Sequence, residues 1–176
     1  VTYGTNGFFI LKDGNSVTDQ SGNSNNFTAA GGTLSNTEDC PSNVFCTLNP
    51  LYQQTSGEGV SLTKGNTRCE YTSDSSRSAF GTIAPSSGKY YFECKPYNKN
   101  LMVVGIANLA WTGINGGAGA FHDNALNFGY NVSGQKTSGG TNTSYGAAVN
   151  NNDIVQVAMD LDNSKLYFGI NGTWQN

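Results

Sequence analysis

Apolar and polar positions alternate most regularly in the last quarter of the chain, between residues 153 and 172. The apolar positions are Val155, Val157, Met159 and Leu161 in a first run and Leu166, Phe168 and Ile170 in a second. This period of two is typical of strands with one buried face. The tetrad Asp162–Lys165 separates the runs, and Asn171-Gly172 follows them as a pair that suits a tight hairpin turn. The pattern predicts an antiparallel meander.

Shorter runs predict further strands earlier in the chain. These are Phe8–Leu11, Arg68–Tyr71, Arg77–Ile83, Lys89–Lys95, Leu101–Ala107 and Leu126–Tyr130. The run 101–107 is apolar on both faces, as in a central strand. We interpret residues 134–140 as a polar turn and residues 108–125 as a long glycine-rich loop. No segment has the apolar spacing of a helix, so the predicted fold class is all-β.

The composition agrees with many short strands joined by tight turns. Charged residues make up only 12% of the 176 residues, and 23 residues are glycine. We expect an antiparallel β-sandwich formed by residues 67–176. The N-terminal strand and extended segments of residues 1–66 are expected to pack on it, which gives one compact unit. Within them, we expect Val44, Phe45, Leu48 and Leu51 to contact a sheet edge.

The charge balance excludes some classes of partner. The net charge is −3, and the nine basic residues are scattered along the chain. Nucleic acids and anionic membranes attract concentrated basic surfaces, so neither is an expected partner. No apolar run approaches the roughly 20 residues of a membrane span, so membrane insertion is not expected either. The neutral polar composition suits an extracellular or virion protein.

Four cysteines are present, at positions 40, 46, 69 and 94. Their spacing matches no zinc motif. Cys94 falls on the apolar face of its predicted strand, so we interpret it as a small buried side chain. Cys40 and Cys46 flank a short loop and could pair, although we favour two separate thiols.

The segment DQSGNSNNFT, residues 19–28, resembles a turn at the start of many concanavalin-like (laminin-G-like) sandwich domains. Asp and Asn side chains in such a turn bond neighbouring backbone N–H groups. Asp19 and Asn23 could also offer oxygen ligands to calcium. Because only one carboxylate is supplied, we favour the turn that bonds to itself.

The order of motifs after residue 80 resembles the SPRY (B30.2-type) domain. The motifs are GKYYFECK, VVGIA, NFGY, SYG and DIVQVAMDLDNSKLYFGING. The resemblance implies a concanavalin-like jelly roll. Two departures are Asn152 and Gln156, which stand where the family has glycine. The family also continues with further core strands after the point where this chain ends, so we expect a longer polypeptide or a neighbouring chain to complete the sheet.

The N-terminal motifs YGTNGFF, DQSGNSNNFT and DCPSNVFCTLNPL, followed by the meander, resemble a module of bacteriophage tail-fibre and other virion proteins. That resemblance implies a location on the surface of the virion.

Candidate catalytic groups are few. His122 and Asp123 are adjacent, but no nucleophile or second base accompanies them. Asp160 and Asp162 could form the carboxylate pair of a glycosidase, although we favour capping of their hairpin. The sequence contains no GxSxG, HExxH or P-loop motif. We therefore expect no catalytic residues, no enzyme activity and no cofactor.

Aromatic residues outside the apolar pattern are better candidates for binding. Aromatic faces stack on sugar rings or fill pockets of a partner, and Asn side chains supply hydrogen bonds. The candidate ligand-binding residues are Tyr97, Trp111, Phe121, His122, Asp123 and Tyr145. As an alternative, Trp111 and Phe121 fold inward and fix their own loop.

The sequence favours a non-enzymatic virion module, a tail fibre or receptor-binding protein that recognises a host surface glycan or protein. Other virion subunits and further copies of the chain within a fibre are the other expected partners. Two alternatives stay open: a structural capsid-decoration or fibre-assembly module, and a polysaccharide-degrading enzyme on the same fold. Each is compatible with a β-sandwich, because this fold hosts many functions.

Overall fold

The structure is a computed structural model that describes residues 1–12, 16–32, 43–53, 60–71, 78–99, 102–108 and 125–175. Its contacts divide the chain into two units, Val1–Cys46 and Thr47–Asn176, and each is described by itself. Trp111, Phe121, His122, Asp123 and Cys40 lie outside the described residues. The predictions made for these five residues stay predictions.

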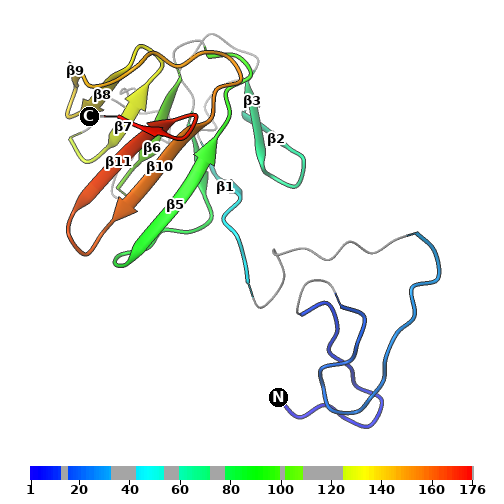
Figure 1. The fold of residues 1–176 in the computed structure, drawn as a ribbon. Coiled ribbons are helices and arrows are strands. Elements are labelled where there is room, and N and C mark those ends of the chain that lie inside the picture. Colours follow the sequence, from blue (N-terminus) through cyan, green and yellow to red (C-terminus); the bar gives the residue numbers. More distant parts are fainter. Residues whose placement is uncertain are drawn as a thin grey trace. The chain divides into compact units, whose positions relative to one another are not determined.

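The second unit is an all-β, antiparallel sandwich (Figure 1). Its strands are β1 (Leu48–Gln53), β2 (Val60–Thr63), β3 (Arg68–Tyr71), β4 (Ala79–Gly81), β5 (Lys89–Cys94), β6 (Val103–Ile106), β7 (Phe128–Asn131), β8 (Gln135–Ser138), β9 (Thr141–Ser144), β10 (Val155–Asp160), β11 (Lys165–Ile170) and β12 (Thr173–Trp174). No helix occurs within the described ranges. The predicted fold class is confirmed.

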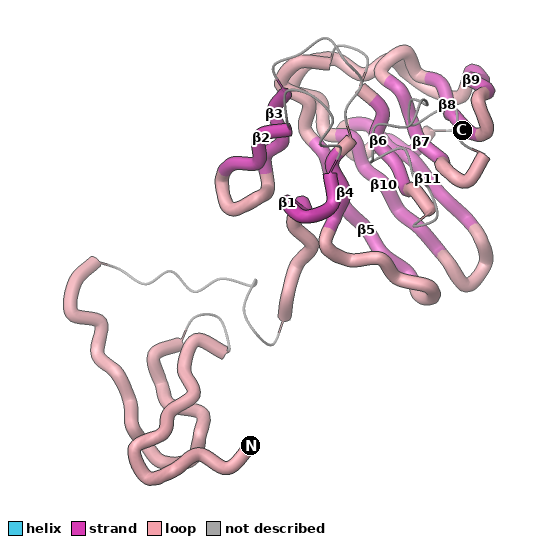
Figure 2. The backbone as a smooth tube through the Cα atoms, turned by 180° about the vertical axis from the view of Figure 1, so that it is seen from behind, coloured by secondary structure: helices cyan, strands magenta, loops and turns pink. Residues whose placement is uncertain are grey.

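Two four-stranded sheets form the layers of the sandwich. The terminal sheet has the order β12-β11-β10-β5, and the meander sheet has the order β6-β7-β8-β9. Opposite views of the chain show the two sheets stacked face to face (Figures 1 and 2). Two short pairs, β1 with β4 and β2 with β3, account for the other strands in the described part of this unit.

The core lies between the two sheets. Its buried side chains are Val104, Tyr130, Val149, Val155, Val157, Phe168 and Ile170. In the terminal sheet the fully buried Val157 pairs with Phe92 of β5 and Phe168 of β11. The alternation predicted for residues 155–161 and 166–170 therefore reflects a real inner face. Cys94 is half-buried and packs against the same core, next to these apolar side chains.

The segment predicted as a polar turn, 134–140, is instead largely strand β8. Gln135–Ser138 pairs with β7 on one side and β9 on the other. Gly139 and Gly140, both with positive φ, form the two-residue hairpin turn that follows β8, a connection that favours glycine. The strand was missed because its side chains are polar on both faces, which removes the hydrophobic alternation.

The region of residues 1–66, for which extended segments were expected after an N-terminal strand, contains β1 and β2. Leu51, expected to contact a sheet edge, is 94% exposed. The predicted boundary between residues 66 and 67 falls inside the β2–β3 hairpin, whose register joins Thr63 to Arg68. The contact-based boundary comes 20 residues earlier, after Cys46. That the segments of residues 1–66 pack on the sandwich stays a prediction.

The first unit has no strand at Phe8–Leu11, although the apolar run predicted one. The backbone groups of this run bond to nearby turns. The Phe9 N–H donates to the Asp19 carboxylate, and the Leu11 N–H donates to the carbonyl of Ser16. Leu11 also has a φ of 62°, which lies outside the strand region. The apolar side chains pack locally, with the rings of Phe8 and Phe27 4.6 Å apart.

Candidate functional site

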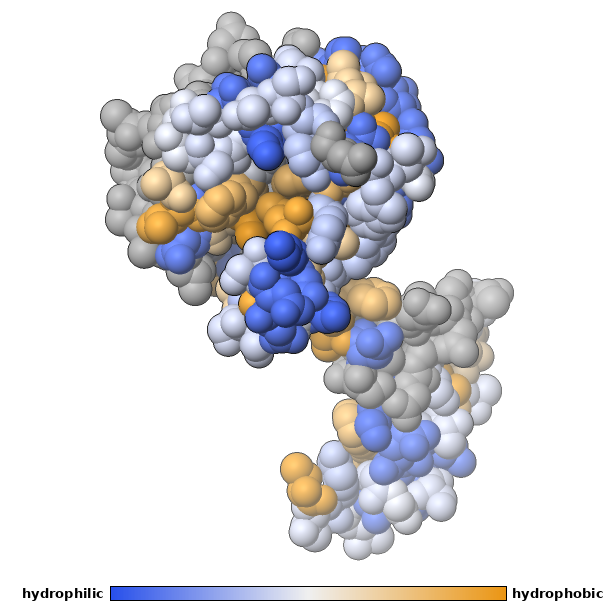
Figure 3. Space-filling model, turned by 60° about the vertical axis from the view of Figure 1, so that its left-hand side comes forward, coloured by the Kyte–Doolittle hydropathy of each residue, from blue (hydrophilic) through white to orange (hydrophobic). Residues whose placement is uncertain are grey.

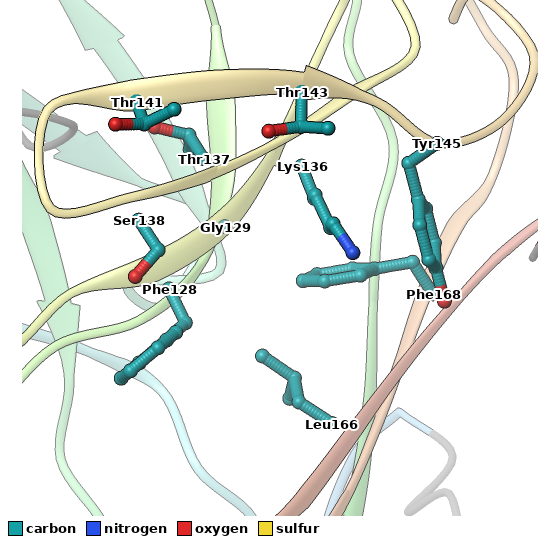
Figure 4. Close-up of a pocket in the computed structure, with 10 residues that line it drawn as sticks. All are labelled: Phe128, Gly129, Lys136, Thr137, Ser138, Thr141, Thr143, Tyr145, Leu166 and Phe168. Carbon is teal, nitrogen blue, oxygen red and sulfur yellow. The ribbon is translucent and has the colours of Figure 1, made fainter.

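An open cavity of about 250 Å³ lies beside Tyr145 (Figure 4). We call it the Tyr145 cavity. Strands β7, β8, β9 and β11 and the chain after β9 supply its lining, which consists of Phe128, Gly129, Lys136, Thr137, Ser138, Thr141, Thr143, Tyr145, Leu166 and Phe168. Of the sequence-predicted site residues, Tyr145 alone is among these ten.

One wall of the Tyr145 cavity is apolar and rigid. Leu166 and Phe168 project inward from β11. The Phe168 ring lies 6.3 Å from the Tyr145 ring at 85° and 5.4 Å from the ring of Tyr130. Edge-to-face packing of this kind stabilises aromatic clusters by about 0.5–1.5 kcal/mol per pair beyond area burial. Tyr145, half-buried in this cluster, is therefore held in place before any ligand arrives.

The facing wall is polar because the inner face of the meander sheet changes from apolar side chains on β7 to polar side chains on β8 and β9. Tyr130 of β7 faces the core, and its row continues to Lys136 of β8 and Thr143 of β9. The neighbouring row ends with Ser138 and Thr141. Residues in one row of a sheet point to the same side. Hydroxyl groups and one ammonium group thus face the aromatic wall, as Figure 4 shows.

Lys136 connects the two walls. Its ammonium nitrogen lies 5.3 Å from the centre of the Tyr145 ring. A cation at this distance from an aromatic face gains about 0.5–1 kcal/mol at an exposed site. The positive charge therefore stays over the cavity, where it can meet a polar or anionic ligand group.

Tyr97 is not part of the Tyr145 cavity. It follows β5, is 61% exposed and has the guanidinium carbon of Arg68 at 5.1 Å from its ring centre. Arg68 also forms an ion pair with Glu70. One ring face of Tyr97 is therefore occupied by a residue of β3. The two described candidates, Tyr97 and Tyr145, do not form a common site.

The candidate calcium ligands form a turn that is saturated with hydrogen bonds. The Asp19 carboxylate accepts bonds from the N–H groups of Phe9, Ser21 and Asn25 and from the Ser21 hydroxyl, at 2.7–2.9 Å. Burial raises the pKa of Asp19, but these four bonds outweigh it and lower the pKa to about 2. Asn23 donates its amide protons to the carbonyls of Gly4 and Gly7. Donors, rather than open oxygen atoms, thus surround this carboxylate.

The two carboxylates weighed as a glycosidase pair bond to turns. Asp160 accepts hydrogen bonds from the backbone and side chain of Asn163 and lies 3.3 Å from the Lys89 ammonium. The Asn163 side chain is the main cause of the lowered pKa of Asp160. Asp162 accepts a bond from the Gly88 N–H. The lowered pKa keeps Asp160 ionised, which makes it a poor general acid because it carries no proton to donate.

Sequence reasoning missed most of the cavity lining. Lys136, Thr141 and Thr143 belong to strands that the sequence did not predict. That their side chains point to the same face of the sheet could therefore not be predicted either. Phe168 was assigned to the core, and its contact with a surface opening depends on the neighbouring sheet. The available signal was the spacing Lys136, Ser138 and Thr141, Thr143, a period of two on either side of Gly139-Gly140.

Hydrophobic surface is also exposed elsewhere on the sandwich, bordered by hydrophilic residues (Figure 3). Among the described residues there is no group of three His, Cys, Asp or Glu side chains that could hold a metal ion. The same residues contain no helix long and apolar enough to cross a membrane.

Comparison with known protein families finds no family model that matches the chain, and comparison with curated proteins finds no matching relative. Over the described residues of the second unit, the structure itself establishes an all-β fold with antiparallel sheets, arranged as a sandwich.

Proposed function

We propose that this chain is a non-enzymatic binding module of a bacteriophage virion. It is part of a tail fibre or receptor-binding protein at the particle surface, and it recognises a glycan or protein on the host. The SPRY-like and phage-like motifs support the family and the virion setting. The observation that carries the binding role is the Tyr145 cavity, with its aromatic wall facing hydroxyl groups and Lys136.

The size of the Tyr145 cavity restricts what enters it. Its volume of about 250 Å³ is below the range of about 300–1,000 Å³ that is usual for small-molecule sites. A single sugar ring or one side chain of a partner protein therefore fits better than a large cofactor. Both have an apolar face and polar groups, which match Phe168 on one wall and Thr143 on the other.

A cavity this small gives modest affinity in one copy. Presentation of several copies on one fibre raises the overall affinity by about 10²–10⁴ without new contacts, provided that the copies reach neighbouring receptors. The proposed function therefore includes assembly with further copies and with other virion subunits.

The test measures binding of the chain, displayed in many copies on beads, to an array of bacterial surface polysaccharides and to whole bacterial cells. Thr143→Val removes one hydroxyl from the cavity with little change in volume, and Lys136→Met removes the charge. Lys95→Met is the matched control, because Lys95 is exposed and does not line the cavity. We expect saturable binding that the two cavity variants weaken and the control does not.

Binding to virion subunits without binding to cells or polysaccharides would favour the structural alternative instead. Release of sugar fragments that is lost in Asp160→Asn would favour the enzyme. The geometry gives the enzyme no specific support, since both candidate carboxylates bond to turns.

A further inference from the structure

Three exposed aromatic side chains share the outer face of the terminal sheet. Tyr91 of β5 is 52% exposed, Tyr167 of β11 is 49% exposed and Trp174 of β12 is 51% exposed. Strand register places Tyr91 and Tyr167 in one row, on either side of Ala158. Trp174 stands in the next row, directly beside Gly169. We call these three aromatic residues the aromatic platform.

Small residues keep the aromatic platform low and open. Ala158 separates the two tyrosines with a single methyl group. A Cβ atom at Gly169 would come within 3.2 Å of Cε3 of Trp174, so the indole lies over the bare backbone of β11. Larger residues at these two positions would form a ridge between the rings. The arrangement therefore leaves a shallow surface that an extended ligand can follow.

Hydrogen bonds fix one end of the platform. The Tyr91 hydroxyl donates to Glu93 Oε1 at 2.5 Å and accepts from Gln156 Nε2 at 2.7 Å. The Oε1 atom of Gln156 in turn accepts from the Gly172 N–H at 2.6 Å. The Tyr91 side chain therefore leans toward the row that contains Glu93 and Gln156. A side chain held this way loses little further rotamer freedom when a ligand binds.

The spacing suits a chain of sugar rings. Tyr91 and Tyr167 are two strands apart, which corresponds to about 9.5 Å. Tyr167 and Trp174 are diagonal neighbours, at about 7–8 Å. The platform therefore exceeds the width of one ring. The C–H face of a sugar packs on an aromatic face, while the second carboxylate oxygen of Glu93, in the next row, can accept hydrogen bonds from its hydroxyl groups.

Charge on this face favours a neutral ligand. One margin holds Glu93, and the opposite margin is the row Lys89–Asp160–Lys165. Asp160 and Lys89 form an ion pair at 3.3 Å. Two acidic and two basic groups balance, so the face attracts neither a polyanion nor a polycation.

The exposed area argues against a second protein as the main occupant. Aromatic side chains bury about 150–250 Å² when fully covered, so three that are half exposed offer roughly 300 Å². A stable protein interface needs about 800 Å² from each partner. A neutral sugar chain needs no such area, because multivalent display compensates for weak single contacts.

We propose that the aromatic platform binds a linear, neutral oligosaccharide. This rests on the proposed function, a module that binds host surfaces, but uses a different site from the Tyr145 cavity. Leu166 and Phe168 point from β11 into the sandwich, whereas Tyr167, between them, points outward. The two sites can therefore be changed separately.

The test titrates the full chain with neutral cello-, malto-, xylo- and manno-oligosaccharides of increasing length, followed by calorimetry and by the NMR signals of Tyr167 and the Trp174 indole N–H. We expect affinity to rise with length until the platform is spanned. Tyr167→Ala or Trp174→Ala should each weaken binding about tenfold. Ile83→Ala is the control, since Ile83 is 46% exposed and lies off the platform.

No binding by any member of this panel, or binding that the platform variants leave unchanged, would overturn the proposal. If Thr143→Val abolishes attachment to cells while the platform variants do not, the proposed function stands and the platform proposal falls. If neither set of variants changes attachment, both fall. Self-association lost in Tyr167→Ala, without sugar binding, would assign the face to a second copy of the chain.

Discussion

The Tyr130 hydroxyl donates a 2.5 Å hydrogen bond to the backbone carbonyl of Ala147. Tyr130 is 1% exposed in the centre of the core, and Ala147 lies two residues after Tyr145. The Ala147 N–H in turn donates to the side chain of Gln175. One buried ring therefore ties the segment that carries Tyr145 to the meander sheet and, through Ala147, to the end of the terminal sheet.

We expect Tyr130→Phe to lower the free energy of unfolding by about 1 kcal/mol. The ring still fills the core, but the hydrogen bond to Ala147 is lost. Urea denaturation measures the change, and Tyr97→Phe is the control, because Tyr97 is exposed. Equal stability of the two variants would show that the bond to Ala147 contributes nothing.

The sequence predicted the terminal sheet well for a physical reason. Residues 155–170 alternate because one face contacts the core and the other contacts water. The resulting alternation of apolar and polar residues can be recognised from this segment alone. Strand β8 was missed because its inner face lines an open cavity rather than the core, so Lys136 and Ser138 are polar. A strand is therefore predictable here when its two faces differ in polarity, and strand propensity alone is not enough.

The aromatic platform was hidden for a different reason. The sequence shows that Tyr91 and Tyr167 each face away from an apolar side. Whether they stand in the same row depends on the register of β5 and β11 against β10, which long-range pairing sets. Trp174 adds a further requirement, the pairing of β12 with β11. Neither the shared row of the two tyrosines nor the pairing of β12 with β11 can be predicted from a local sequence pattern.

Gly105→Ala should strongly destabilise the meander sheet. A Cβ atom at Gly105 would lie 2.1 Å from the carbonyl oxygen of Phe128 in the adjacent strand. Backbone cannot move aside as a side chain can, so we expect a loss of about 3 kcal/mol or a failure to fold. Gly4→Ala is the control, with no atom within 4 Å of the added methyl group. Thermal unfolding of both variants gives the comparison, and equal midpoints would contradict the predicted clash.

Val157→Ala should lower the free energy of unfolding by about 2–3 kcal/mol. Val157 is fully buried between Phe92 and Phe168, so the change removes buried methyl groups and leaves a cavity. Leu51→Ala, at a side chain that is 94% exposed, should change stability by less than about 0.5 kcal/mol. Chemical denaturation measures both. A small effect at Val157 would mean that the two sheets pack less closely than the structure indicates.

The turn around Asp19 should respond to acid at an unusually low pH. The pKa of this carboxyl is lowered from 3.8 to about 2 by its hydrogen bonds to Phe9, Ser21 and Asn25. A lowered pKa means that the ionised form stabilises the folded turn. Its contribution is therefore complete above pH 3.8 and is lost as the pH falls through about 2.

An NMR titration of the Phe9 and Asn25 amide signals tests this behaviour. We expect both signals to change together, with a midpoint near pH 2, because both N–H groups donate to the Asp19 carboxylate. Asp19→Asn should abolish the transition and leave these amides less protected from exchange at neutral pH. Asp162→Asn, which removes a carboxylate of the sandwich unit, should leave it unchanged. A midpoint near 3.8 would mean that the four hydrogen bonds do not hold the carboxylate in solution, and the segment 19–28 would then be free to adopt other conformations.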